Sequence, residues 1–269
     1  MKAAVFDYVR PKDVGEALKA LASMQGEAKP IAGGQSLGPM LNLRLARPKL
    51  LVDVSRIDSL KEIKDEGNAW RIGASVTHAQ LEDRPLAGCE PLAQVARVVA
   101  YRAVRNRGTV GGSLAHADPA ADWPLVFATL DAVVRVIGPS GTRDIKADAF
   151  MTAAFTTSLA DDEIVESVRV PKLGSGARWG YYKFCRKTGE FPEAAAALLL
   201  DAQRRVARLF AGALERPPQP LDTVARAVAQ EGTASADMIS AALARVAPGL
   251  GPAARKLRAT AVKRAILQS

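Results

Sequence analysis

The chain reads Arg105-Asn106-Arg107-Gly108-Thr109-Val110-Gly111-Gly112-Ser113 directly after a segment, 92–104, whose apolar residues recur at helical spacing. This pattern predicts a helix followed by a glycine-rich loop. Because glycine has no Cβ, such a loop lets an oxygen-rich ligand approach the backbone and offers N–H groups to a phosphate. The hydroxyl groups of Thr109 and Ser113 are additional donors.

Another loop, earlier in the chain, has the same character. Residues 29–32 predict a strand, Lys29-Pro30-Ile31-Ala32, that runs into Gly33-Gly34-Gln35-Ser36. Together the two loops could hold both phosphates of a dinucleotide, although each Gly-Gly pair by itself more often marks a turn or tight packing. Neither loop continues into Gly-Lys-Ser/Thr and neither contains G-x-G-x-x-G, so these two nucleotide-binding patterns are disfavoured.

The segments around the loops predict two units of mixed strands and helices. The first unit has a helix that begins after Asp13, with Glu16 placed as in a capping box. Its other expected elements are strands at 4–6, 29–32 and 50–54 and a helix over 39–45. The second unit has expected strands at 60–63, 69–72, 132–137 and 163–170, and helices from Thr77, over 92–104 and over 122–130.

A change of composition at 172–176, Lys-Leu-Gly-Ser-Gly, indicates a linker. Beyond it, the pattern predicts strands at 180–185, 194–200 and 205–211 and alanine-rich helices at 223–229, 236–246 and 255–267. We therefore expect two domains that divide near residue 174.

The amino-acid composition limits the classes of protein to which the chain can belong. The chain has 269 residues, of which 48% are hydrophobic and 24% charged, as in soluble globular proteins. Only two cysteines occur, Cys89 and Cys185, so cysteine-ligated zinc or iron–sulfur centres are not expected on this chain. The few cysteines favour a reducing compartment, the start lacks a signal pattern, and the longest apolar run, 194–200, is too short to span a membrane. We expect a cytoplasmic protein.

Longer stretches around both loops resemble the FAD-binding medium subunit of the molybdenum hydroxylases. This family includes medium subunits of carbon monoxide, nicotine and other N-heterocycle dehydrogenases and the flavin domain of xanthine dehydrogenase. The resemblance covers the whole chain, including Leu257-Arg258-Ala259-Thr260. The stretches that carry it include Ile31-Ala32-Gly33-Gly34-Gln35-Ser36-Leu37, Leu43-Arg44-Leu45-Ala46-Arg47-Pro48, Leu51-Val52-Asp53-Val54 and Lys183-Phe184-Cys185-Arg186-Lys187-Thr188-Gly189-Glu190-Phe191. The highly specific one is residues 105–122, in which the loop quoted at the start continues as Leu114-Ala115-His116-Ala117-Asp118-Pro119-Ala120-Ala121-Asp122.

The resemblance implies an α+β fold of the vanillyl-alcohol-oxidase (PCMH) type. The FAD-binding domain, 1–174, would consist of two subdomains, about 1–56 and 57–174, with FAD between them. A small α/β C-terminal domain, 175–269, would follow with a short sheet and helices.

The resemblance also implies where FAD contacts the chain. The pyrophosphate would lie against Ile31, Ala32, Gly33, Gly34, Gln35 and Ser36 from one subdomain and Thr109, Val110, Gly111, Gly112 and Ser113 from the other. Asp122 matches an acid that binds FAD, Leu159 a backbone contact at the adenine end, and Lys183 a basic residue near the flavin ring. An aromatic side chain beside the flavin is expected, at Tyr181 or Tyr182.

Several of these residues also have plain structural interpretations. Asp122 could cap the helix that follows it, and the two histidines, His78 and His116, are more often structural or solvated than catalytic. Because a flavin carries the redox chemistry, no catalytic side chain and no metal ligand is expected on this chain. Two groups of arginines have two possible interpretations each, a solvated face or a contact to phosphate or a neighbouring subunit. The first group is Arg102, Arg105 and Arg107, and the second is Arg204, Arg205 and Arg208.

The function implied is that of an oxidoreductase subunit, which carries FAD and transfers electrons in a heterotrimeric molybdenum hydroxylase. The molybdopterin and two iron–sulfur clusters would reside on a large and a small partner subunit, in a dimer of heterotrimers, and electrons would leave through FAD to an external acceptor. One alternative is a self-contained FAD-dependent oxidase or reductase of the same superfamily, although residues 175–269 offer little room for a substrate domain.

The net charge of +9 first suggests another alternative, a nucleic-acid-binding protein. Aromatic residues make up only 5% of the chain, which disfavours base stacking. The charge is also uneven, because residues 202–269 hold 11 basic and 4 acidic residues while the FAD-binding part is nearly neutral. We interpret this excess as a docking face for acidic partner subunits, without nucleic acid or a membrane span.

Overall fold

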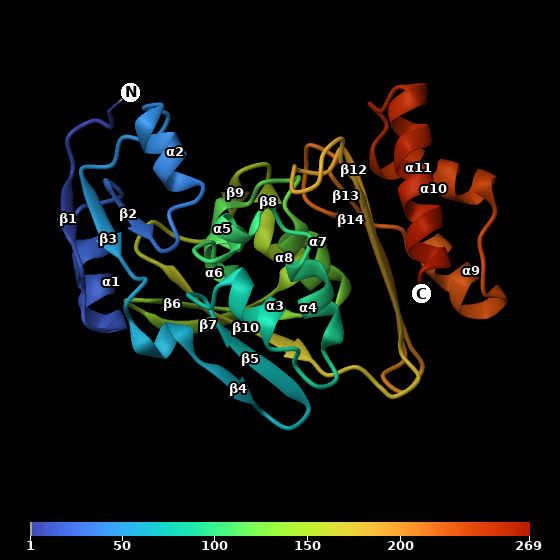
Figure 1. The fold of residues 1–269 in the computed structure, drawn as a ribbon, viewed down its shortest axis with the longest axis horizontal. Coiled ribbons are helices and arrows are strands. Elements are labelled where there is room, and N and C mark those ends of the chain that lie inside the picture. Colours follow the sequence, from blue (N-terminus) through green and yellow to red (C-terminus); the bar gives the residue numbers. More distant parts are fainter. Residues whose placement is uncertain (1) are drawn as a thin grey trace.

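The computed structural model describes residues 2–269. At its N-terminal end, a parallel sheet has the order β1-β3-β2, and the helix α1 packs its Ala17 and Leu21 against Leu50 and Val52 of β3. Asp13 caps α1 as predicted, its carboxylate accepting from the Glu16 N–H at 2.8 Å. The elements of this part, blue in Figure 1, are β1 (Asp7–Val9), α1 (Val14–Ala22), β2 (Ala28–Ile31), α2 (Leu37–Asn42) and β3 (Leu50–Asp53).

Two expectations in this part are wrong by a few residues. The strand predicted at 4–6 begins only at Asp7, which pairs with Leu50, and Val5 is left 97% exposed. The helix predicted over 39–45 begins at Leu37 instead, and the left-handed backbone of Arg44, with φ of 58°, follows its end. In both cases pairing and turn geometry, rather than the apolar pattern, set the boundary.

The middle of the chain forms a five-stranded antiparallel sheet with the order β4-β5-β10-β6-β7. Its strands are β4 (Ile63–Asp65), β5 (Ala69–Gly73), β6 (Val133–Gly138), β7 (Gly141–Lys146) and β10 (Ile164–Pro171). In β10, Val168 pairs with Ile72 on one side and Val134 on the other, and all three are fully buried. The strand predicted at 60–63 is wrong in its first part, because Asp58–Lys61 is a short 3-10 helix, η1.

Helices cover one face of this sheet and enclose the largest core, around Trp123, Phe127 and Phe150 (Figure 1). They are α3 (His78–Asp83), α4 (Glu90–Ala96), α5 (Arg102–Arg105), α6 (Val110–His116), α7 (Asp122–Thr129) and α8 (Ala147–Phe150), and the short strands β8 (Met151–Ala153) and β9 (Thr156–Thr157) pair beside them. The helix start predicted at Thr77 is confirmed by a capping box between Thr77 and Gln80.

The helix predicted over 92–104 is wrong: α4 ends at Ala96 and the chain resumes a helix only at Arg102. Ala100 has a φ of 45°, a left-handed conformation that a continuous helix cannot contain. The Arg105 guanidinium stabilises this break by donating to the carbonyls of Val99 and Ala100, at 3.1 and 3.0 Å.

The C-terminal part is an antiparallel sheet, β11-β12-β13-β14, covered by three helices (Figure 1, orange and red). The predicted strands and helices are confirmed here, with small differences at their ends: β11 (Arg178–Phe184), β12 (Ala194–Asp201), β13 (Val206–Gly212), α9 (Asp222–Glu231), α10 (Ala236–Val246) and α11 (Pro252–Leu267). The short strand β14 (Gln219–Pro220) was not predicted.

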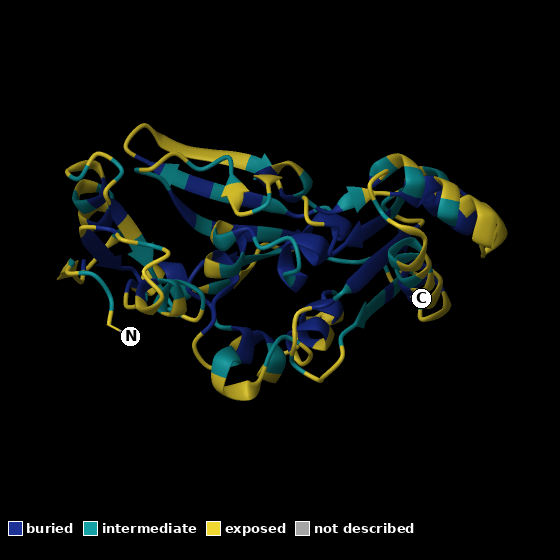
Figure 2. Ribbon diagram, turned by 90° about the horizontal axis from the view of Figure 1, so that it is seen from above, coloured by how far each residue is buried: buried dark blue, intermediate teal, exposed yellow. Residues whose placement is uncertain are grey.

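Every residue of β12 is buried, because both faces of this sheet are covered (Figure 2). Ala195 and Ala197 pack on α7, whereas Ala196 and Leu198 pack on the C-terminal helices. The sheet therefore lies directly against the middle part of the chain. Within residues 2–269, no helix is both long and apolar enough to span a bilayer.

Candidate functional site

The two glycine-rich loops lie against each other, although they are about seventy residues apart in the sequence. An ideal Cβ built on Gly33 would fall 1.9 Å from the Arg107 carbonyl oxygen and 3.0 Å from the Gly108 Cα. In addition, the Arg107 Nε donates to the Gly33 carbonyl at 3.3 Å. Gly33 is thus required for close packing, and the contact forms a seam between the N-terminal sheet and the middle part of the chain.

In chain order, the first loop is 33–36 and the second is 105–113. The first loop has free hydrogen-bond donors. Within residues 2–269, no group accepts a hydrogen bond from the backbone N–H of Gly33, Gly34, Gln35 or Ser36. Gly34 has a φ of 70°, and the nearest atom to a Cβ built there is 3.6 Å away, on Ile31. Successive free N–H groups around a left-handed residue are suited to bind an anion. This loop therefore has the chemistry that a phosphate group requires.

The second loop differs from the expectation, because its N–H groups are used within the protein. Val110 donates to the Val76 carbonyl at 3.0 Å and Gly111 to the Ala74 carbonyl at 2.8 Å. Thr109 caps α6 and accepts from Gly112, at 3.1 Å. Residues 110–116 are helical rather than a loop.

Gly111 is also a packing glycine. A Cβ built there would fall 2.4 Å from the Ala74 Cβ. The Gly112 position is exposed, and a Cβ there would meet only the Thr109 hydroxyl, at 2.8 Å. Ser113 is half-buried. What this loop can offer a ligand is therefore a side chain or an open surface at Gly112, not a row of N–H groups.

Asp122 and Lys183 are brought together at a second place, between α7 and β11. The Lys183 Nζ donates to the two Asp122 carboxylate oxygens at 3.1 and 3.3 Å, and both side chains are more than nine-tenths buried. Tyr181 also donates its hydroxyl to Asp122. Burial, and then the neighbouring Asp122 charge, raise the pKa of Tyr181. The carboxylate is held by these partners and makes no cap to α7, so the capping interpretation is wrong.

The structure separates the two tyrosines of β11. Tyr181 faces α7 and Asp122, whereas the ring of Tyr182 faces α11, with the Arg264 guanidinium 5.2 Å from its centroid. Adjacent residues of a strand point to opposite faces of the sheet. Of the two, only Tyr181 lies beside other candidate residues.

Leu159 lies in the turn before β10 and packs, half-buried, against the main core. Its N–H donates to the Thr157 hydroxyl at 3.2 Å, and no hydrogen bond within the described chain joins it to another candidate residue. The same turn approaches β2, since Asp161 lies 4.0 Å from the Lys29 Nζ. The structure therefore places Leu159 near the start of β2, on a separate element from both glycine-rich loops.

Comparison with known proteins identifies the family. The family described as "FAD binding domain in molybdopterin dehydrogenase" matches residues 4–173. The chain belongs to this family. It is therefore a component of an oxidoreductase with an FAD-binding domain, as the resemblance implied.

Named relatives agree with this assignment. The carbon monoxide dehydrogenase medium chain of Hydrogenophaga pseudoflava is 39% identical over 197 residues, which are 72% of this chain and 69% of the relative. The 6-hydroxypseudooxynicotine dehydrogenase complex subunit alpha of Paenarthrobacter nicotinovorans is 40% identical over 212 residues, covering 77% of this chain and 72% of the relative.

Solved structures extend the similarity over the full chain. The carbon monoxide dehydrogenase of Hydrogenophaga pseudoflava that lacks the Mo-pyranopterin moiety matches with a TM-score of 0.90 at 31% identity, over 100% of this chain and 98% of that one. Quinoline 2-oxidoreductase from Pseudomonas putida 86 matches with a TM-score of 0.88 at 32% identity, over 99% and 97%. The predicted α+β fold class, with an FAD-binding domain, is confirmed.

In this FAD-binding chain, sequence reasoning missed the way His78 supports the second loop. The His78 ring is buried and its Nδ1 accepts from the Trp123 Nε1 at 3.0 Å, while the backbone N–H of His78 donates to the Gly108 carbonyl. A Cβ on Gly108 would lie 2.9 Å from the ring. Burial lowers the pKa of His78 to about 4. The helix start predicted at Thr77 is the sequence signal that places this histidine in a helix.

The arginines resolve into different roles. Arg102 pairs with Glu82 and Asp83, and Arg105 pairs with Glu82 at 2.8 Å. Arg208 pairs with Asp131 and Asp148. These side chains hold elements of the fold together, whereas Arg107 reaches the first glycine-rich loop.

The other histidine and Cys89 pack within the fold. His116 is half-buried, with its ring 5.3 Å from that of Phe155. Burial raises the pKa of Cys89 to about 12, so this thiol stays protonated, as an inert cysteine would.

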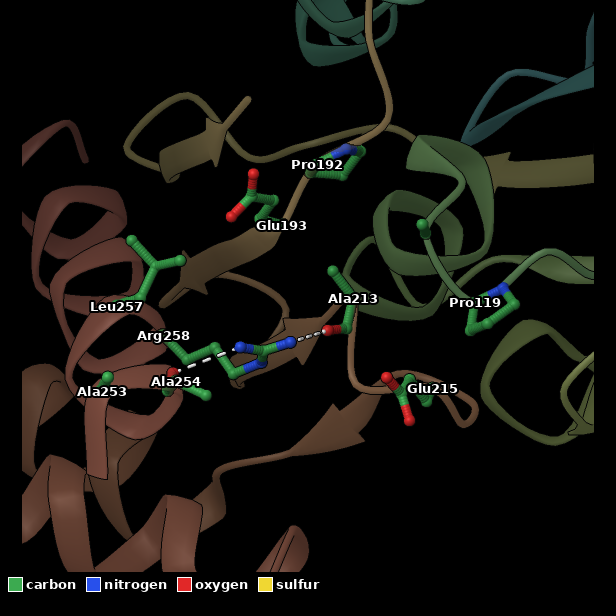
Figure 3. A pocket seen from close by; sticks show the side chains of 10 residues that line it. Pro119, Pro192, Glu193, Ala213, Glu215, Ala253, Ala254, Leu257 and Arg258 are labelled. Carbon is green, nitrogen blue, oxygen red and sulfur yellow. Dashed lines mark hydrogen bonds between the residues drawn. The ribbon is translucent and has the colours of Figure 1, made fainter. Parts of the chain in front are cut away.

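A cavity of about 510 Å³ lies apart from these candidates, between the start of α11 and the segment that precedes α7 (Figure 3). Arg258 extends across it and donates to the carbonyls of Ala213 and Ala254, at 2.7 and 3.2 Å. None of the predicted site residues lines this cavity. The candidate site is thus the seam between the loops together with the Asp122–Lys183 pair.

Proposed function

We propose that this chain is the FAD-carrying, electron-transfer subunit of a multi-subunit molybdenum hydroxylase. The observation that carries the proposal is the loop at Gly33–Ser36, whose four N–H groups are free within residues 2–269 and which lies inside the region matched by the FAD-binding family. Its relatives are named as medium chains and as subunits of dehydrogenase complexes, which supports a role within a complex.

The residues present fit FAD. Ile31–Ser36 would hold the pyrophosphate through free backbone N–H groups, and Thr109–Ser113 would form the opposite wall. The Asp122–Lys183 pair would present its polar groups to the flavin half, and the Leu159 turn would lie at the adenine end. Bound FAD would supply the redox chemistry of the subunit.

Under this proposal the chain divides as the sequence suggested. The FAD-binding domain is 1–174, with subdomains of about 1–56 and 57–174, and the C-terminal domain is 175–269. Support comes from the family match, which ends at residue 173. Lys183 of the C-terminal domain would then reach across to Asp122 and complete the site.

The rest of the complex is part of the same proposal. A small partner subunit would carry two iron–sulfur clusters and a large one the molybdopterin, in a dimer of heterotrimers. Electrons would pass from the clusters to this chain and then to an external acceptor. A cytoplasmic location is also proposed, on the basis that Cys89 and Cys185 are both free thiols.

The basic C-terminal part supports docking to acidic partner subunits. The helix α11 carries five basic residues and no acidic one. The fold uses some of this charge internally, since Arg258 donates to Ala213 and Arg264 lies over Tyr182. Lys256 and Lys263 remain exposed and form no ion pair within residues 2–269.

The proposal is tested by purifying the full chain alone and together with candidate partner subunits encoded beside it. We expect the chain alone to take up FAD with a flavin absorption spectrum, and candidate substrates to bleach that flavin only when the partners are present. A chain that binds no FAD contradicts the proposal. Bleaching of the flavin by a substrate without partners supports the self-contained oxidase or reductase instead.

A further inference from the structure

We propose that Arg107 is a binding residue for the pyrophosphate of FAD, reaching from the second glycine-rich loop to the phosphates held by the first. The inference rests on the proposed function, because it needs FAD as the ligand. It assigns the second loop a charged side chain where the sequence suggested backbone N–H groups.

The position of Arg107 is the first support. Its Nε donates to the Gly33 carbonyl at 3.3 Å, so the guanidinium contacts the loop whose N–H groups, at Gly33, Gly34, Gln35 and Ser36, are free within residues 2–269. The side chain is exposed, and within residues 2–269 its two terminal nitrogens donate to no acceptor. A guanidinium with free terminal donors is suited to bind phosphate through two parallel hydrogen bonds.

The neighbouring arginines provide the second support. Arg102 and Arg105 precede it on the same segment, and both are neutralised by Glu82, with Asp83 as a further partner of Arg102. Arg107 has no carboxylate within 4.0 Å among the described residues. A pyrophosphate carries about two negative charges. It would therefore give the Arg107 guanidinium the ion pairing that carboxylates of the protein give to Arg102 and Arg105.

The hydrogen bonding of the second loop is the third support. Val110, Gly111 and Gly112 all donate to acceptors within the protein, so their N–H groups are not free for a phosphate. A contribution of this loop to the pyrophosphate must therefore come from a side chain. Arg107 is the cation of this loop that reaches across the seam.

A merely structural role is the competing explanation, in which Arg107 only joins the two loops through Gly33. The two roles differ in what they do to different ligands. A loosened seam weakens the binding of every flavin, whereas a lost phosphate contact weakens FAD and leaves riboflavin, which has no phosphate, unchanged.

The test is a fluorescence titration of the full apo-chain with FAD and with riboflavin, for the wild type, Arg107→Gln and Arg107→Lys. We expect Arg107→Gln to weaken FAD binding about tenfold or more, as for the loss of a charge-assisted hydrogen bond. Riboflavin affinity should not change. Arg107→Lys should recover part of the FAD affinity, because it keeps the charge and loses the planar fork.

Arg97→Gln is the matched control, since Arg97 is an exposed arginine at the end of α4 without an ion pair in the described chain. We expect it to bind FAD as the wild type does. A second measurement needs no variant: raising KCl from about 50 mM to about 500 mM should weaken wild-type binding of FAD more than that of riboflavin, because salt screens the charge contact.

The outcomes are separable. If the wild type binds FAD and Arg107→Gln binds it equally well, the role of Arg107 is overturned while the proposed function stands. Equal losses for FAD and riboflavin, or a salt effect equal for both, also overturn it in favour of the structural role. If the wild-type chain binds no FAD, the proposed function fails, and the inference fails with it.

Discussion

The two Gly-Gly pairs of this chain look alike in sequence and differ in the folded protein. In each pair the first glycine packs against backbone or a neighbouring Cβ, Gly33 against Arg107 and Gly111 against Ala74. The second glycine is less confined, because a Cβ on Gly34 would meet only Ile31, at 3.6 Å, and one on Gly112 only the Thr109 hydroxyl, at 2.8 Å. The N–H groups differ completely, since those around Gly34 are free within residues 2–269 and those around Gly111 are bonded. A Gly-Gly pair therefore reports close packing at one residue, and only the surroundings decide whether it also binds an anion.

The largest loss of stability is expected for a substitution of Gly111, the packed glycine of the second loop. Gly111→Ala would place a Cβ 2.4 Å from the Ala74 Cβ and strain the hydrogen bond from Gly111 to the Ala74 carbonyl. We expect the free energy of unfolding to fall by about 3 kcal/mol, as for overpacking in a core. Urea denaturation of the variant and the wild type measures this. An unchanged stability would break the comparison, because Gly111 would then not be a packing glycine.

The stability of the protein should also depend on pH, through His78 beside the second loop. Its pKa is lowered from 6.5 to about 4 in the folded protein, so between these values the unfolded chain binds a proton that the native protein does not. The contribution of His78 to the free energy of unfolding should therefore be fully present at pH 7. It should be lost as the pH falls through this window, by about 3 kcal/mol in total. Urea denaturation at a series of pH values checks this for the wild type and for His78→Gln, whose amide can still accept from Trp123. The same slope in both proteins would contradict the assignment.

A smaller loss of stability is expected for a substitution of Gly34, the second glycine of the first loop. Gly34→Ala puts a side chain at a φ of 70°, which costs about 1–2 kcal/mol of stability. Gly67→Ala is the matched control, because Gly67 has a φ of 81° in the turn between β4 and β5, with no atom within 4 Å of a Cβ. Both variants should lose similar stability in thermal unfolding, and only Gly34→Ala should weaken FAD binding. Equal FAD affinity for the two variants would remove Gly34 from the site.

The smallest change in stability is expected for Gly112→Ala. Its Cβ would meet only the Thr109 hydroxyl, at 2.8 Å, which can turn away at the cost of the cap to the Gly112 N–H. The gain in helix propensity, about 1 kcal/mol, offsets that loss. We expect a free energy of unfolding within about 1 kcal/mol of the wild type, measured beside Gly111→Ala. A loss as large as that of Gly111→Ala would show that the second glycine is packed as well.

Much of the fold was predictable from local patterns. The continuous apolar run at 194–200 predicted a strand, and β12 confirms it. The Asp13 cap of α1 and the Thr77 start of α3 were read from single residues and are confirmed. The helix over 92–104 was wrong, because its interruption depends on Arg105 binding the carbonyls of Val99 and Ala100.

The candidate site was predictable in its residue types and not in its contacts. Asp122 and Lys183 are 61 positions apart, and their pairing follows from the packing of β11 on α7. The choice between Tyr181 and Tyr182 likewise depended on which face of β11 meets that helix. These contacts arise from tertiary packing, which no local sequence pattern encodes.

By itself the sequence determined the family motifs, several buried strands and some helix starts, because these follow from side-chain size, polarity and spacing along the chain. Only the tertiary structure decided which N–H groups of the two loops remain free within residues 2–269. That depends on acceptors brought from elsewhere, here the carbonyls of Ala74 and Val76 in the turn after β5. A donor buried against such an acceptor is satisfied, and a donor without one keeps its capacity to bind a ligand.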